Sequence, residues 1–230
     1  MRLTTIVLAS LLALTGCTDG DPSREVKPAP KPSVLPQTLV ESIGLSPADL
    51  PKRSSVELIR NGDQLEGEPT LDECGVVFQS EAHRVARHQV DVHFAKSLPG
   101  TYSNEVVAYD SPESAELALQ EWRRAVQDCN EDEFHPSAVE GVPDVKVRLQ
   151  EFHTLESLPV SNNAVARQLV VTRAGNYEFL SIVMQQQGTV LDAHYLTTAR
   201  QPRRRQVARL TQQARATGAR LVELANGTTT

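Results

Sequence analysis

The alternation of apolar and polar positions predicts a chain rich in strands. Apolar residues recur at every second position in several short stretches, which is the period of a strand with one face buried. The clearest case is Val145, Val147 and Leu149, which alternate with polar residues. On this basis we expect strands over 56–60, 86–94, 102–109, 145–150, 164–173, 177–185 and 189–197.

Two longer stretches have helical spacing instead. Ser111 and Pro112 offer an N-cap and a first-turn proline for a helix that runs to about Asp128. A second helix is expected after Pro202, and a short helical turn over 46–50. Sequential strands with short turns pair antiparallel. The expected fold is therefore α+β: a single domain with a twisted antiparallel sheet and two principal helices packed on it, both on one face.

The N-terminus carries the parts of a secretory signal. Arg2 is followed by an apolar run over 3–14, about a dozen residues, whereas a membrane span needs roughly 20. The sequence Leu14-Thr15-Gly16-Cys17 resembles the lipobox of bacterial lipoproteins. That resemblance implies cleavage before Cys17 and a diacylglyceryl group on its sulfur. We expect residues 1–16 to be a lipoprotein signal peptide; an ordinary signal with a chance cysteine is the alternative.

Prolines crowd the segment that follows. Residues 17–37 hold the lipidated cysteine and a polar, proline-rich stretch that buries too little apolar surface to fold. At about 3.1 Å per residue such a tether would reach roughly 60 Å from the bilayer. We expect residues 38–230 to form the globular domain, lipid-anchored on the outer face of the cell membrane.

The three cysteines fit this interpretation. If Cys17 carries lipid, an even pair remains, Cys74 and Cys129. Disulfides persist in exported proteins, so we expect these two residues to form one bridge. A redox pair is the alternative, and the absence of a Cys-x-x-Cys motif disfavours it.

The chemistry-bearing residues form no catalytic or metal-binding motif. His83, His88 and His93 recur every five residues, a spacing that scatters them over different faces of a strand or helix. No zinc motif, nucleophile elbow, phosphate-binding loop or dinucleotide fingerprint is present, so no metal or cofactor is expected. The net charge of −6, or −7 without Arg2, disfavours nucleic acid as a partner.

The C-terminal helix is strongly basic. Its arginines fall away from the apolar stripe: Arg204, Arg205, Arg209, Arg215 and Arg220. An ordinary solvated helix face would have this pattern. A cationic face that rests on anionic headgroups or cell-wall phosphates is the functional alternative.

Several short motifs carry a further resemblance. The chain resembles a group of actinobacterial lipoproteins in a series of short features. These are Leu71 to Gly75, the residues Ser80, Glu81, Arg84 and Arg87, the stretch 103–107, and a helix that ends at Cys129. More distantly, the order of elements resembles the extracellular sensor domains of actinobacterial Ser/Thr kinases. That resemblance implies an antiparallel sheet with helices around a ligand-binding cleft.

These observations favour a non-enzymatic domain that binds a small molecule, an envelope component or a partner protein. Its site is expected on the concave face between sheet and helices. Candidate ligand contacts are Ser80, Glu81, Arg84 and Arg87. A cell-envelope hydrolase with an unrecognised site, and an accessory protein acting only through protein contacts, are the alternatives.

Overall fold

The computed structural model describes residues 35–70, 76–94, 99–128, 145–150, 163–173 and 176–227. The compact unit begins at Val34. Cys17, Cys74 and Cys129 lie outside the described residues, so the lipid anchor and the disulfide stay predictions. No described helix has the length and apolar character needed to cross a membrane.

The seven predicted strands and both predicted helices are present, with ends displaced by a few residues. The strands are β1 Ser55–Leu58, β2 Arg84–His93, β3 Thr101–Tyr109, β4 Val145–Gln150, β5 Ala164–Arg173, β6 Asn176–Gln187 and β7 Val190–Thr198. The helices are α1 Pro36–Ile43, η1 Pro47–Asp49, η3 Gln79–His83, α2 Pro112–Asp128 and α3 Arg204–Gly227. α1 was not predicted, and it begins inside the range assigned to the tether.

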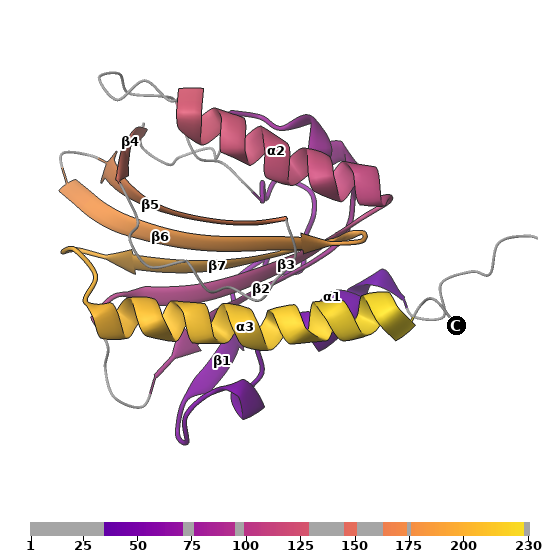
Figure 1. The fold of residues 1–230 in the computed structure, drawn as a ribbon, viewed down its shortest axis with the longest axis horizontal. Helices are drawn as coiled ribbons and strands as arrows, with labels where there is room; N and C mark the ends of the chain where they lie inside the picture. Colours follow the sequence, from indigo (N-terminus) through magenta and orange to yellow (C-terminus); the bar gives the residue numbers. More distant parts are fainter. Residues whose placement is uncertain are drawn as a thin grey trace, which may run out of the picture. The chain divides into compact units, whose positions relative to one another are not determined.

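The strands form one seven-stranded sheet in the order β1-β2-β3-β7-β6-β5-β4. Every neighbouring pair is antiparallel, and β3 and β7 lie side by side at its centre (Figure 1). The α+β fold with a twisted antiparallel sheet is thereby confirmed.

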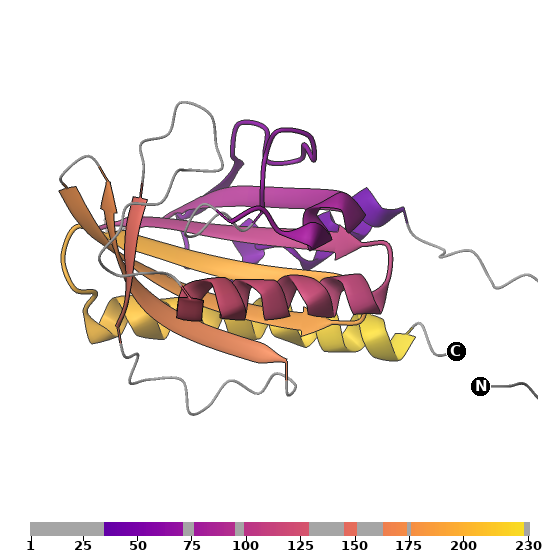
Figure 2. The same ribbon diagram turned by 90° about the horizontal axis from the view of Figure 1, so that it is seen from above.

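The helices lie on both faces of the sheet, so the expectation that both principal helices share one face is wrong. Val107 packs with Trp122 of α2, whereas its neighbour Val106 packs with α1 and with Leu221 of α3. Figures 1 and 2 show the sheet between α2 and α3. The cause lies in β3, whose consecutive residues from Val106 to Tyr109 are all buried. A strand that is apolar on both faces requires a cover on each.

Local hydrogen bonds fix the starts of two helices. Ser111 Oγ accepts a hydrogen bond from Ser114 N at 3.1 Å, which confirms the predicted N-cap of α2. At the start of η1, Asp49 accepts a hydrogen bond from Ser46 N at 2.8 Å.

The guanidinium of Arg220 contacts Asp49 at 2.7 Å and donates to the carbonyl oxygen of Ile43. Arg220 therefore clamps α3 to the segment after α1, and does not belong to the solvated face on which it was predicted.

Candidate functional site

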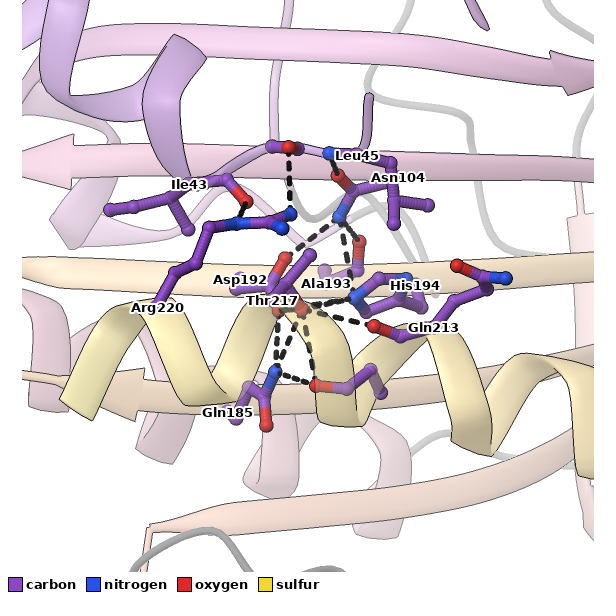
Figure 3. Close-up of polar contacts among 12 residues, drawn as sticks. Ile43, Leu45, Asn104, Gln185, Asp192, Ala193, His194, Gln213, Thr217 and Arg220 are labelled. Carbon is purple, nitrogen blue, oxygen red and sulfur yellow. Dashed lines mark hydrogen bonds and ion pairs between the residues drawn. The ribbon is translucent and has the colours of Figure 1, made fainter. Parts of the chain in front are cut away.

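A buried polar network lies between the sheet and α3 (Figure 3). We call Asn104, Gln185, Asp192, His194 and Thr217 the Asp192 network. Strands β3, β6 and β7 and helix α3 each contribute to it. All five residues are fully buried. The network joins β3 to β6, β7 and α3, which lie more than 60 residues later in the sequence.

Asp192 lies at the centre and accepts hydrogen bonds at both carboxylate oxygens. Asn104 Nδ2 donates to Oδ1 at 2.7 Å, while Gln185 Nε2 and Thr217 Oγ1 each approach Oδ2 to 2.6 Å. His194 Nε2 lies 3.1 Å from the same oxygen. Burial alone would raise the pKa of Asp192, but His194 and these donors outweigh it and lower the pKa below its ordinary value.

His194 connects Asp192 to Tyr102. Its Nδ1 lies 3.2 Å from the Tyr102 hydroxyl, and its Nε2 lies 2.8 Å from Thr217 Oγ1. Burial and the charge of Asp192 raise the pKa of Tyr102 well above its ordinary value, so this hydroxyl keeps its proton. It can then donate to Nδ1, and the Nε2–H of His194 can donate to Asp192.

The acid, the imidazole and the hydroxyl are arranged as in a proton relay, but no side of the network faces solvent. Its remaining bonds go to the protein backbone: Asn104 Oδ1 accepts from Leu45 N at 2.9 Å, and Gln185 Nε2 donates to Ala214 O at 2.6 Å. Gln185 Oε1 has no hydrogen-bond partner in the described part of the chain, but the other bonds of this buried network fix the relative position of the elements that form it. We therefore assign the Asp192 network to the architecture of the domain.

Sequence reasoning missed this network, although a signal was present. Asp192 and His194 sit two residues apart in a strand, so they share a face, and the residues around them are apolar. A charged residue among buried neighbours requires a partner. Because the nearest partners come from β3, β6 and α3, the sequence pattern could not name them.

A second polar cluster occupies the opposite face and contains Arg87. The Arg87 guanidinium pairs with Glu105, and the Tyr195 hydroxyl donates to the same carboxylate at 3.1 Å. Both charged side chains are nearly inaccessible, 4% and 1% exposed. Burial raises the pKa of Glu105, although Arg87 and the hydrogen bonds oppose the increase. Arg87 also donates to Asn61 O at 3.0 Å, which holds the segment 59–70 against this cluster.

The other predicted contacts lie beside this cluster. Arg84 pairs with Glu81 at 2.8 Å and donates to the carbonyl oxygens of Leu65 and Glu68. Burial raises the pKa of Glu81, and Arg84 opposes that increase. Ser80 is fully buried, and its hydroxyl has no hydrogen-bond partner in the described part of the chain. In this conformation Arg84 and Arg87 bind the protein itself, so a ligand would reach them only after segment 59–70 moves.

No metal site emerges from the described residues. They contain no group of three or more His, Cys, Asp or Glu side chains arranged to hold an ion. His83 contacts Asp110 at 2.9 Å, and the more exposed His93 lies 3.7 Å from Glu57. His83 and His93 therefore have separate surroundings.

Comparisons with known proteins give a structural likeness but no family. No protein-family model matches the chain, and no curated protein matches it. Among solved structures it is similar to the extracellular domain of PknH from Mycobacterium tuberculosis, with a TM-score of 0.47 and 9% sequence identity. The match covers 83% of this chain and 96% of that one.

Proposed function

We propose that this chain is a lipid-anchored extracytoplasmic domain that binds a ligand and catalyses no reaction. The observation that carries the proposal is Leu14-Thr15-Gly16-Cys17 at the end of a signal-like apolar run. Two acyl chains on Cys17 would provide stable anchoring, for which a single chain is insufficient.

The buried position of the Asp192 network supports the non-enzymatic part of the proposal. Asp192 and His194 are the described pair that most resembles an acid–base apparatus, and the exposed fraction of each side chain is 0%. A substrate would have to displace α3 to reach them. General acid–base catalysis requires the catalytic group within hydrogen-bond reach of the substrate.

For the binding site we propose the cluster around Arg87, with Ser80, Glu81, Arg84 and Arg87 as ligand contacts. The buried Ser80 hydroxyl supports this choice, because an unsatisfied buried hydroxyl is costly and a bound ligand would satisfy it. Tyr195, a member of the cluster, is partly exposed, and a shift of segment 59–70 would give a ligand access to Arg84 and Arg87. The ligand class is a small molecule, an envelope component or a protein segment. Its polar groups would match two arginines, Arg84 and Arg87, and the carboxylates of Glu81 and Glu105.

Mass spectrometry of the chain extracted from the membranes of its own host would test both parts of the proposal. Under denaturing conditions we expect a chain that begins at Cys17 and carries the mass of a diacylglyceryl group. Under native conditions we expect an additional bound mass in the wild-type protein and a reduced occupancy in Ser80→Ala. A native mass equal to that of the lipidated chain alone would contradict the binding function and leave the anchor intact.

A further inference from the structure

We infer that the outer face of α3 lies on the anionic lipid headgroups of the membrane that holds the anchor. The inference depends on the proposed lipidation for its location, because the tether is what keeps the domain beside a bilayer. It extends the proposed function by giving the domain a second contact with the membrane and hence a fixed orientation.

Four exposed arginines gather where α3 begins: Arg200, Arg203, Arg204 and Arg205. The first turn of α3 contains no acidic residue. The N-terminal end of a helix carries a partial positive charge, so arginines there repel both the helix dipole and one another. An anionic surface would remove this repulsion, whereas water alone only screens it.

The same helix presents apolar surface at its other end. Val222 is 40% exposed, and Leu35, which immediately precedes α1, is 75% exposed. α1 packs on this end of α3 through the contacts of Leu221 with Val40 and Ile43 (Figure 1). Arginines together with apolar side chains are typical of a surface that binds in the headgroup region, and a purely anionic wall polymer would give the apolar residues no partner.

The geometry allows the tether and the arginines to reach one bilayer together. The tether precedes α1 in the sequence, and α1 packs beside Leu221 of α3. Arg204 lies 17 residues before Leu221 on the same helix, a distance of about 26 Å at 1.5 Å per residue. An extended tether over 18–35 would span roughly 55 Å, so it permits α3 to lie flat. Arg204 and Val222 are five helical turns apart and share one side of the helix.

Co-sedimentation with lipid vesicles would test the inference without the lipid anchor. The mature chain without lipid, residues 18–230, retains every described element, since the compact unit begins at Val34. We expect it to bind vesicles of equimolar phosphatidylglycerol and phosphatidylcholine, and to bind more weakly as NaCl increases. Phosphatidylcholine alone should retain little protein.

A triple variant, Arg203→Gln with Arg204→Gln and Arg205→Gln, should bind the anionic vesicles about 100-fold more weakly, because each arginine near such a surface contributes about fivefold. The matched control Lys52→Gln, Arg60→Gln and Arg124→Gln loses the same charge from exposed positions elsewhere and should bind as the wild type does. Far-ultraviolet circular dichroism would verify that all three proteins are folded.

Three outcomes would overturn the inference. The first is equal sedimentation of the triple variant and the wild type; the second is equal loss of binding in the triple variant and its control. The third is binding to soluble polyphosphate but not to vesicles, which would assign the arginines to a wall polymer. None of these results bears on whether Cys17 is lipidated, so the proposed anchor is tested separately.

Discussion

Replacing Asp192 with alanine is expected to lower the free energy of unfolding by about 3–5 kcal/mol, because a buried hydrogen-bond network loses its central acceptor. The variant would leave the donors of Asn104, Gln185 and Thr217 without their acceptor in the core. Each unsatisfied buried group costs about 1–3 kcal/mol. Because whole domains are stable by only about 5–15 kcal/mol, this single change should remove much of the stability.

Urea denaturation followed by circular dichroism would measure the effect. Asp63→Ala is the matched control, because Asp63 is exposed, and it should stay within about 0.5 kcal/mol of the wild type. A change below about 1 kcal/mol in Asp192→Ala would show that the network does not hold the elements together.

The pH dependence of stability gives a second measurement on the same carboxylate. The pKa of Asp192 is lower in the folded state than its ordinary value of 3.8. The ionised Asp192 carboxylate therefore contributes fully to the free energy of unfolding above its unfolded-state pKa. This contribution is lost as the pH falls through the lower pKa of the folded state. Asp192→Asn lacks this titrating carboxyl. As the pH falls below 3.8, its free energy of unfolding should therefore decrease less than that of the wild type.

Arg87→Met is expected to cost about 3–5 kcal/mol, because it leaves the buried Glu105 carboxylate without its cation. Replacing both partners should lower the free energy of unfolding far less. Exchanging a buried ion pair for apolar residues of similar volume often leaves stability unchanged. We therefore expect Arg87→Met with Glu105→Leu to be more stable than Arg87→Met alone. The hydroxyl of Tyr195, which donates to Glu105, would limit the recovery.

A double-mutant cycle in the same denaturation assay would measure this coupling. Arg124→Met, on the exposed side of α2, is the control for loss of one arginine and should change stability little. If the costs of the two single changes simply add in the double variant, then Arg87 and Glu105 do not act as a pair.

The local period of the sequence was enough to predict the strands and the two long helices. It was not enough to place the helices on opposite faces, although the consecutive buried residues Val106 to Tyr109 carried that information. α1 was missed because Pro36 was counted with the tether prolines, whereas proline is also favoured in the first turn of a helix.

Pairings between distant residues could not be read from the sequence. Arg220 was expected on the solvated face of its helix, and its partner Asp49 lies 171 residues away. Arg87 was singled out as a ligand contact, but nothing local indicated that Glu105 would take up its charge. A side chain that looks available along the sequence is often neutralised by a residue that only the fold brings near.

The fate of a Cys17→Ala variant in the native host tests the central claim most directly. Wild-type protein and the tether control Ser23→Ala should remain with the membrane fraction and require detergent for release. Cys17→Ala should either appear in the soluble extracytoplasmic fraction or stay unprocessed at the larger mass of the precursor. A Cys17→Ala protein that is still cleaved at the same position and still needs detergent would contradict the lipid anchor.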